Sequence, residues 1–167
     1  SVEAHKRAMT FCQPGIYEYE LQAEIEHQFN KSGASGPAYT SIVGGGKNAC
    51  VLHYIENKDI LKDGDLVLID AGCEYENYAA DITRTFPVNG KFSIQQAAIY
   101  DIVLEALEQA IEVTQSGAPY NVTNETTIKV ITEGLVNLGL LQGEVTDLIT
   151  SEAHREFYMH GAGHWLG

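Results

Sequence analysis

The sequence predicts an α+β fold, formed as one domain over residues 1–167. Three observations lead to this prediction. An apolar run and a returning strand lie between positions 65 and 87, apolar residues recur at helical spacing between positions 99 and 111, and two helical stretches precede residue 33. A chain of this length forms an ordinary single domain, and no repeat, low-complexity tract or linker divides it.

The first third of the chain is expected to form two helices. Residues 2–12 are helix-like, and Pro14-Gly15 ends that helix. The second helix ends near Gly33, and one face of it carries the apolar residues Tyr19, Leu21, Ile25 and Phe29.

Two short strands are expected next, over residues 39–43 and 49–54, and the second carries His53. Residues 44–46 are three glycines, which interrupt the first strand. Because no GK[ST] follows them, they are a weak phosphate-loop signal. We interpret them as a tight turn or a close approach of the backbone.

The most informative stretch runs from residue 65 to residue 87, where a hairpin is predicted. Residues 66–69 are apolar and typical of a strand buried on both faces, and residues 78–86 form the returning strand. Asp70 ends the first strand and Asp81 lies in the second. With the turn centred on residues 75 and 76, these two aspartates oppose each other, with Cβ atoms roughly 4.5–5.5 Å apart.

Two opposed carboxylates repel, and burial of either one alone is costly. A shared proton, a basic partner such as Arg84, or a bound cation would relieve this repulsion. Paired oxygen ligands suit hard divalent ions, and a two-metal centre needs bridging carboxylates. The alternative is an ordinary hairpin with two solvated aspartates and a structural salt bridge, and spacing alone leaves both open.

The second half of the chain is predicted to be mainly helical. A turn at Asn89-Gly90 leads to Ser93, which caps a helix extending to about residue 115. Its apolar face is expected to contain Ile99, Ile102, Val103, Leu107 and Ile111. Another helix is expected over residues 122–138, and both are interpreted as packing elements.

Composition limits the compartment and the partners. A net charge of −13 argues against nucleic acid, and no apolar run reaches the ~18 residues of a membrane helix, so no membrane partner is expected. The cysteines (Cys12, Cys50 and Cys73) are odd in number and lack CxxC spacing. Reduced thiols in a cytoplasmic protein are the simplest interpretation.

The closing segment is the second informative stretch. His160 and His164 lie four residues apart around two glycines, and imidazole is the commonest nitrogen ligand of transition metals. His53 is a weaker candidate, whereas His5, His27 and His154 are interpreted as surface residues. A serine or cysteine nucleophile is poorly supported, because no GxSxG is present and no cysteine has an adjacent cationic motif.

Three motifs together carry a resemblance: GDLVLIDAGCEY (64–75), DITRTFPVNGKF (81–92) and MHGAGHWLG (159–167). They resemble the metal-binding motifs of the pita-bread metallopeptidases, and TRTF and HWLG favour the Xaa-Pro aminopeptidase (aminopeptidase P) branch. The similarity extends through SIVGGGKNACVLHY (41–54) and IYDIVLEAL (99–107). It implies a pita-bread fold.

The resemblance also implies roles for individual residues. Asp70 would chelate one metal, Asp81 would bridge two, and His164 would bind the other. His53 and His160 would orient substrate and stabilise charge on the scissile carbonyl. The implied cofactor is a pair of Mn²⁺ ions, and the implied reaction is hydrolysis of the bond before a proline at position two of a peptide. The full-length protein is expected to be a homo-oligomer.

The family completes its site with two glutamates and a further histidine beyond the last motif, whereas this chain stops at Gly167. We therefore expect a piece of such an enzyme, with an incomplete C-terminal part, weak metal binding and little activity of its own. Two alternatives stay open. One is a catalytically dead pita-bread module that binds peptides or proteins, and the other is a prolidase acting on Xaa-Pro dipeptides.

Overall fold

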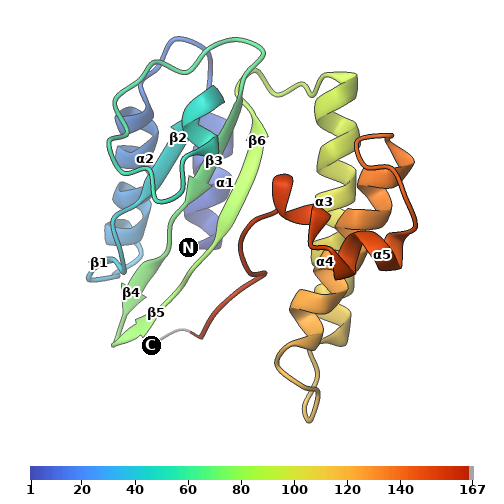
Figure 1. Ribbon diagram of the computed structural model, residues 1–167. Helices are drawn as coiled ribbons and strands as arrows, with labels where there is room; N and C mark the ends of the chain where they lie inside the picture. The colour runs from blue at the N-terminus through green and yellow to red at the C-terminus, as the bar shows by residue number, and fades with distance from the viewer. Residues whose placement is uncertain (166–167) are drawn as a thin grey trace. The chain divides into compact units, whose positions relative to one another are not determined.

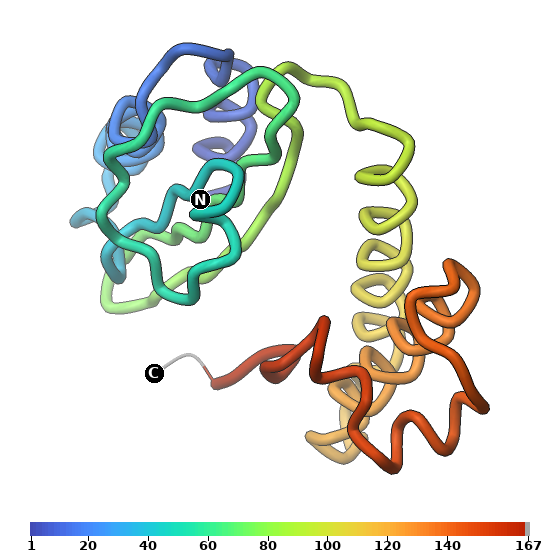
Figure 2. Tube along the Cα trace, turned by 45° about the horizontal axis from the view of Figure 1, so that its top comes forward, coloured from blue at the N-terminus to red at the C-terminus, as the bar shows by residue number. Residues whose placement is uncertain are grey.

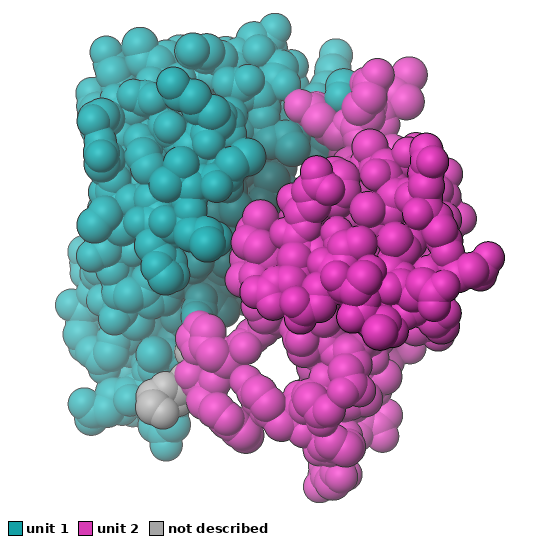
Figure 3. Space-filling view, viewed as in Figure 1, with its two compact units in different colours: residues 1–93, 166–167 teal, residues 94–165 magenta. Residues whose placement is uncertain are grey.

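The computed structural model describes residues 1–165, and Leu166 and Gly167 lie outside the described residues. The chain forms two compact units, coloured separately in Figure 3: residues 1–93 make up the first and residues 94–165 the second. Within the described part of the chain, no helix combines the length and the apolar character needed to cross a membrane.

Unit 1 consists of two helices and two small antiparallel sheets (Figure 1). The strand orders are β2-β3-β6 and β1-β4-β5. In chain order the elements are α1 (Val2–Phe11), α2 (Glu18–Lys31), β1 (Gly36–Pro37), β2 (Ile42–Gly45), the 3₁₀ helix η1 (Gly46–Cys50), β3 (Leu66–Asp70), β4 (Cys73–Tyr75), β5 (Tyr78–Ala79) and β6 (Thr83–Pro87).

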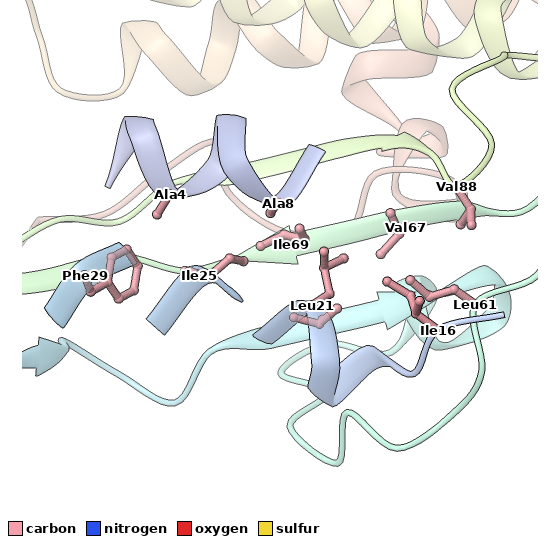
Figure 4. Packing of buried hydrophobic residues seen from close by; sticks show 12 residues of the cluster. Ala4, Ala8, Ile16, Leu21, Ile25, Phe29, Leu61, Val67, Ile69 and Val88 are labelled. Atoms are coloured by element: carbon pink, nitrogen blue, oxygen red, sulfur yellow. The ribbon is translucent and has the colours of Figure 1, made fainter. Parts of the chain in front are cut away.

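The core of unit 1 lies between the helices and one face of β3. Val67 and Ile69 are fully buried against apolar side chains of α1 and α2, as Figure 4 shows. Leu66 and Leu68 are only half-buried. The prediction of a strand buried on both faces is therefore wrong, because the helices cover one face and side chains alternate along a strand.

The hairpin forms as predicted, but its register differs. Asp70 pairs with Thr83, not with Asp81, and Glu74 pairs with Ala79. The turn residues are Glu76 and Asn77, both with positive φ (49° and 68°), as a two-residue type I′ turn requires. The turn thus lies one residue later than expected, which moves each cross-strand partner by two positions.

A shift of two positions preserves the face on which a side chain lies. Asp81 is therefore a diagonal neighbour of Asp70 on the same side, and not its direct partner. Gly72 lets the backbone at Ala80 approach closely, since a Cβ atom on residue 72 would lie 1.6 Å from the carbonyl oxygen of Ala80.

Three predicted elements of unit 1 need correction. Tyr19 is 49% exposed, and the buried face of α2 contains Glu18 with Leu21, Ile25 and Phe29. The strand expected over residues 39–43 is β2, which continues through Gly44 to Gly45. The strand expected over residues 49–54 is absent from the described structure, because residues 46–50 form η1 and an irregular segment follows.

Close approach explains the glycines of β2. A Cβ atom on Gly44 would lie 2.9 Å from backbone atoms of Asn48, and one on Gly45 would lie 2.5 Å from Leu61 Cδ2. The interpretation of these glycines as a close backbone approach is therefore confirmed.

Unit 2 is helical, with α3 (Ile94–Val113), α4 (Val122–Asn137), α5 (Val145–Thr150) and the 3₁₀ helix η2 (Ala153–Glu156). The two long helices confirm the predicted ranges to within two residues. They lie side by side and run antiparallel, as the chain trace in Figure 2 shows. Contacts at both ends agree with this, since Ile102 lies against Gly134 and Thr114 contacts Thr123.

The predicted apolar face of α3 is largely wrong. Ala106 and Ala110 are the buried residues, whereas Val103 and Ile111 are 52% and 64% exposed. Small side chains occupy the interface because the helices pack closely, and a Cβ atom on Gly134 would lie 2.6 Å from Ile102 Cγ2.

Candidate metal centre

Two aspartate side chains converge in unit 1. Asp70 is the last residue of β3, and Asp81 lies in the stretch between β5 and β6. The hydroxyl of Tyr39 lies 2.5 Å from Asp70 Oδ1 and 2.9 Å from Asp81 Oδ1. The structure therefore brings the two carboxylates together on one face, although the strand register that predicted their proximity is wrong.

Tyr39 is the residue that sequence reasoning missed. It lies in the loop between β1 and β2, where the backbone N–H of Ala38 donates to the carbonyl of Gly72 (2.8 Å). Burial raises the pKa of the Tyr39 phenol, and its hydrogen bonds to the two aspartates raise it further. The phenol therefore stays protonated and supplies one hydrogen to two carboxylates.

The carboxylate pair offers oxygen atoms of the kind that hard divalent cations prefer. Arg84, considered as a basic partner, donates from Nη1 to the carbonyl of Thr83 (2.7 Å). Both carboxylates contact the same hydroxyl, so their oxygens lie close to a common point. The donor set in unit 1 therefore fits part of a divalent metal site.

His53 lies in the irregular segment that follows η1. Its side chain is exposed, and its backbone has a positive φ of 55°. Such a conformation is uncommon for a residue other than glycine, and it is concentrated at functional positions.

The other two histidines belong to unit 2, and both are exposed. His160 Nδ1 lies 2.9 Å from the carbonyl oxygen of Gly161, and its ring packs tilted against Tyr158. His164 Nδ1 lies 2.8 Å from the carbonyl oxygen of Trp165, and Trp165 stacks on Tyr120 at a centroid distance of 5.0 Å.

Among residues 1–165, no group of three or more histidine, cysteine, aspartate or glutamate side chains gathers as metal ligands would. The liganding roles of Asp70, Asp81 and His164, and the substrate roles of His53 and His160, remain predictions. All three cysteines are free thiols.

Two histidines interpreted as surface residues are buried, whereas His27 is exposed as predicted. His154 is 5% exposed and His5 is 4% exposed. Burial lowers the pKa of His5, so its neutral imidazole donates from Nε2 to the carbonyl of Ala71 (2.8 Å). This bond connects α1 to the residue after Asp70, a long-range contact that helical spacing alone does not reveal.

A mixed fold, an acidic pair and two Gly-flanked histidines are features of a class of metal-dependent peptidases. The chain belongs to Metallopeptidase family M24, whose profile matches residues 1–167.

Within that family, the chain is similar to the Xaa-Pro aminopeptidase of Escherichia coli strain K12. The identity is 55% over 164 residues, which cover 98% of this chain and 37% of that protein. The solved structure of Pseudomonas aeruginosa aminopeptidase PepP matches with a TM-score of 0.98 and 59% identity, over 100% of this chain and 38% of that one.

Structures of Escherichia coli aminopeptidase P match with a TM-score of 0.96 and 55% identity, over 99% of this chain and 38% of theirs. They include a variant in complex with substrate and a zinc-substituted form in complex with product. The chain thus has the fold of the corresponding part of these proteins, and it spans about 38% of their length.

Proposed function

We propose that this chain is part of a metal-dependent aminopeptidase that releases the N-terminal residue of peptides with proline at position two. The observation that carries the proposal is the convergence of Asp70 and Asp81 on the Tyr39 hydroxyl. Family membership and 55% identity to a protein named Xaa-Pro aminopeptidase support this substrate class.

The residues proposed to hold metal are Asp70, Asp81 and His164, with Asp81 bridging two ions. We propose Mn²⁺ as the natural metal, although a zinc-substituted form of a relative exists. When bound, such a metal pair supplies a strong nucleophile from water at neutral pH and polarises the scissile carbonyl.

The protein's own side chains have separate tasks in this proposal. The Tyr39 hydroxyl fixes the separation and the orientation of the two carboxylates. His53 and His160 donate hydrogen bonds that orient the peptide and stabilise negative charge on the carbonyl oxygen of the first residue. The exposed position of both imidazoles is compatible with contact to a substrate.

The remaining proposals concern the whole protein. We propose a cytoplasmic location, peptides as the binding partners, and a homo-oligomer as the working form. Residues 1–167 contain only part of the ligand set that the resemblance implies, namely Asp70, Asp81 and His164. We therefore propose weak metal binding and little activity for this stretch in isolation.

The test measures release of the first residue by the full-length gene product in Mn²⁺. An Xaa-Pro-Xaa tripeptide should be cleaved, and the matched tripeptide with alanine at position two should not. Cleavage of Xaa-Pro dipeptides alone would favour a prolidase, and peptide binding without cleavage would favour the catalytically dead module.

Asp81→Asn should lower the rate by several orders of magnitude, because one ligand oxygen is lost and the remaining oxygen carries less charge. Asp147→Asn is the matched control, since Asp147 is an exposed residue of α5 in unit 2. Equal activity of the two variants would contradict the proposed role of Asp81.

A further inference from the structure

A carboxylate outside the candidate metal centre is fully buried. Glu18, the first residue of α2, has 0% exposure. Its Oε1 accepts hydrogen bonds from the backbone N–H of Gly45 (2.8 Å) and from Asn48 Nδ2 (3.0 Å). Its Oε2 accepts from the Tyr54 hydroxyl (2.8 Å) and from the backbone N–H of Asp59 (3.0 Å).

Burial of a charged carboxylate is costly unless its oxygens are hydrogen-bonded. Here each oxygen receives two donors, and the location at the start of a helix adds a favourable dipole. All four donors come from residues 45–59, a segment with little regular structure beyond η1. The conformation of this segment therefore depends on contacts with the Glu18 carboxylate.

The same network draws the two ends of the segment together. Asn48 Nδ2 lies 2.9 Å from Asp59 Oδ2 and 3.0 Å from the Tyr54 hydroxyl. Burial raises the pKa of Tyr54 to about 12, and its hydrogen bond to Glu18 acts in the same direction. Tyr54 therefore remains a hydroxyl donor at neutral pH.

His53 lies inside this closed segment, directly before Tyr54. Its positive φ of 55° is a conformation that persists only where the surrounding structure enforces it. The Glu18 network provides that constraint, since Tyr54 is anchored to the buried carboxylate while the His53 side chain remains exposed.

We propose that Glu18 is a positioning residue, which holds residues 45–59 in the conformation that presents the His53 imidazole to substrate. This inference rests on the function proposed for His53 above. It assigns to a buried carboxylate of α2 a role in catalysis that is exerted only through another residue.

The test is a double-mutant cycle in the full-length gene product. Glu18→Gln keeps the shape of the side chain but replaces one acceptor oxygen with an NH₂ group that faces two donors. We expect kcat/KM for an Xaa-Pro-Xaa peptide to fall roughly 10- to 100-fold, as a small misplacement of a catalytic group produces. In a His53→Ala background, the same substitution should have less than about a twofold further effect.

Glu26→Gln is the matched control. Glu26 lies two turns further along α2, and its Oε1 accepts from the hydroxyl of Ser41 (3.1 Å). It should leave kcat/KM unchanged. Tyr54→Phe is a milder second variant, which removes one donor to Glu18 and should give a smaller loss that also vanishes in the His53→Ala background.

Hydrogen exchange provides a readout that does not depend on activity. The amides of Gly45 and Asp59 should exchange faster in Glu18→Gln, because their acceptor is weakened. Unchanged protection of both amides would overturn the proposal.

Losses that multiply between Glu18→Gln and His53→Ala would also overturn it, because they would mean that Glu18 contributes to stability alone. If His53→Ala is fully active, the role proposed for His53 fails. If His53→Ala is impaired and Glu18→Gln is fully active, only the role of Glu18 fails.

Discussion

Replacement of Tyr39 by phenylalanine should weaken binding of divalent metal by the full-length gene product about 10- to 100-fold, the usual effect of losing a group that orients metal ligands. The substitution retains the ring and removes only the hydroxyl. That hydroxyl lies 2.5 Å from Asp70 Oδ1 and 2.9 Å from Asp81 Oδ1, so its loss removes a group that hydrogen-bonds both carboxylates and fixes their relative orientation.

The hydroxyl should also stabilise the metal-free protein. A hydrogen bond to a partly exposed carboxylate contributes about 1 kcal/mol, and the Tyr39 hydroxyl contacts two carboxylates. We therefore expect Tyr39→Phe to lower the free energy of unfolding by about 1–2 kcal/mol.

Isothermal titration calorimetry with Mn²⁺ measures the affinity, and urea denaturation in chelator measures the stability. Tyr78→Phe is the matched control, because Tyr78 lies at the tip of the same hairpin and is 82% exposed. If Tyr39→Phe binds Mn²⁺ as tightly as Tyr78→Phe and unfolds at the same urea concentration, the hydroxyl does not organise the two aspartates.

Three further predictions concern backbone, thiol and activity. Gly72→Ala should lower the free energy of unfolding by about 3 kcal/mol or more, because its Cβ would meet the Ala80 carbonyl oxygen. Gly45→Ala would meet only a movable Leu61 methyl group, so it should unfold at a higher urea concentration than Gly72→Ala. The reverse order would contradict the close approach of Ala80 to Gly72. Burial raises the pKa of the Cys12 thiol to about 11, so the stability that it contributes below pH 9 should be lost as pH rises towards 11. Cys12→Ala should abolish this loss of stability between pH 9 and pH 11. An unchanged dependence of stability on pH in Cys12→Ala would contradict this role of the thiol. Residues 1–167, expressed alone, should cleave an Xaa-Pro-Xaa peptide orders of magnitude more slowly than the full-length gene product; equal rates would show that no further ligand is needed.

Periodicity and turn chemistry were sufficient for much of the fold. The first long helix of unit 2 follows from the apolar spacing of residues 99–111, and the hairpin follows from two strand-like runs around a polar turn. One further signal would have predicted the register. Asn77 tolerates positive φ better than Tyr75, so a turn at residues 76 and 77 is favoured over one at residues 75 and 76.

The buried face of α3 could not be read from hydrophobicity alone. Ala106 and Ala110 are buried and Gly134 of α4 lies close against Ile102, whereas larger apolar residues such as Ile111 remain exposed. That outcome depends on a residue in another helix, which the spacing within α3 does not contain.

The candidate site was predictable where its residues lie in motifs. Asp70 and Asp81 are visible as carboxylates in the two strand segments of one hairpin, and the structure brings them together. Tyr39 was not predictable, because it comes from a loop 31 residues before Asp70 and no spacing relates the two. Glu18 was not singled out from the sequence, because only tertiary contacts reveal its four donors.

The most direct test of the proposed metal centre is the anomalous scattering of Mn²⁺ in crystals of the full-length gene product. Two peaks should appear at ligand distance from the carboxylates, with Asp81 contacting both, Asp70 contacting one and His164 contacting the other. Data from Asp81→Asn crystals should show at least one peak lost. Peaks remote from Asp70 and Asp81, or two peaks unaffected by Asp81→Asn, would contradict the assignment of these aspartates as metal ligands.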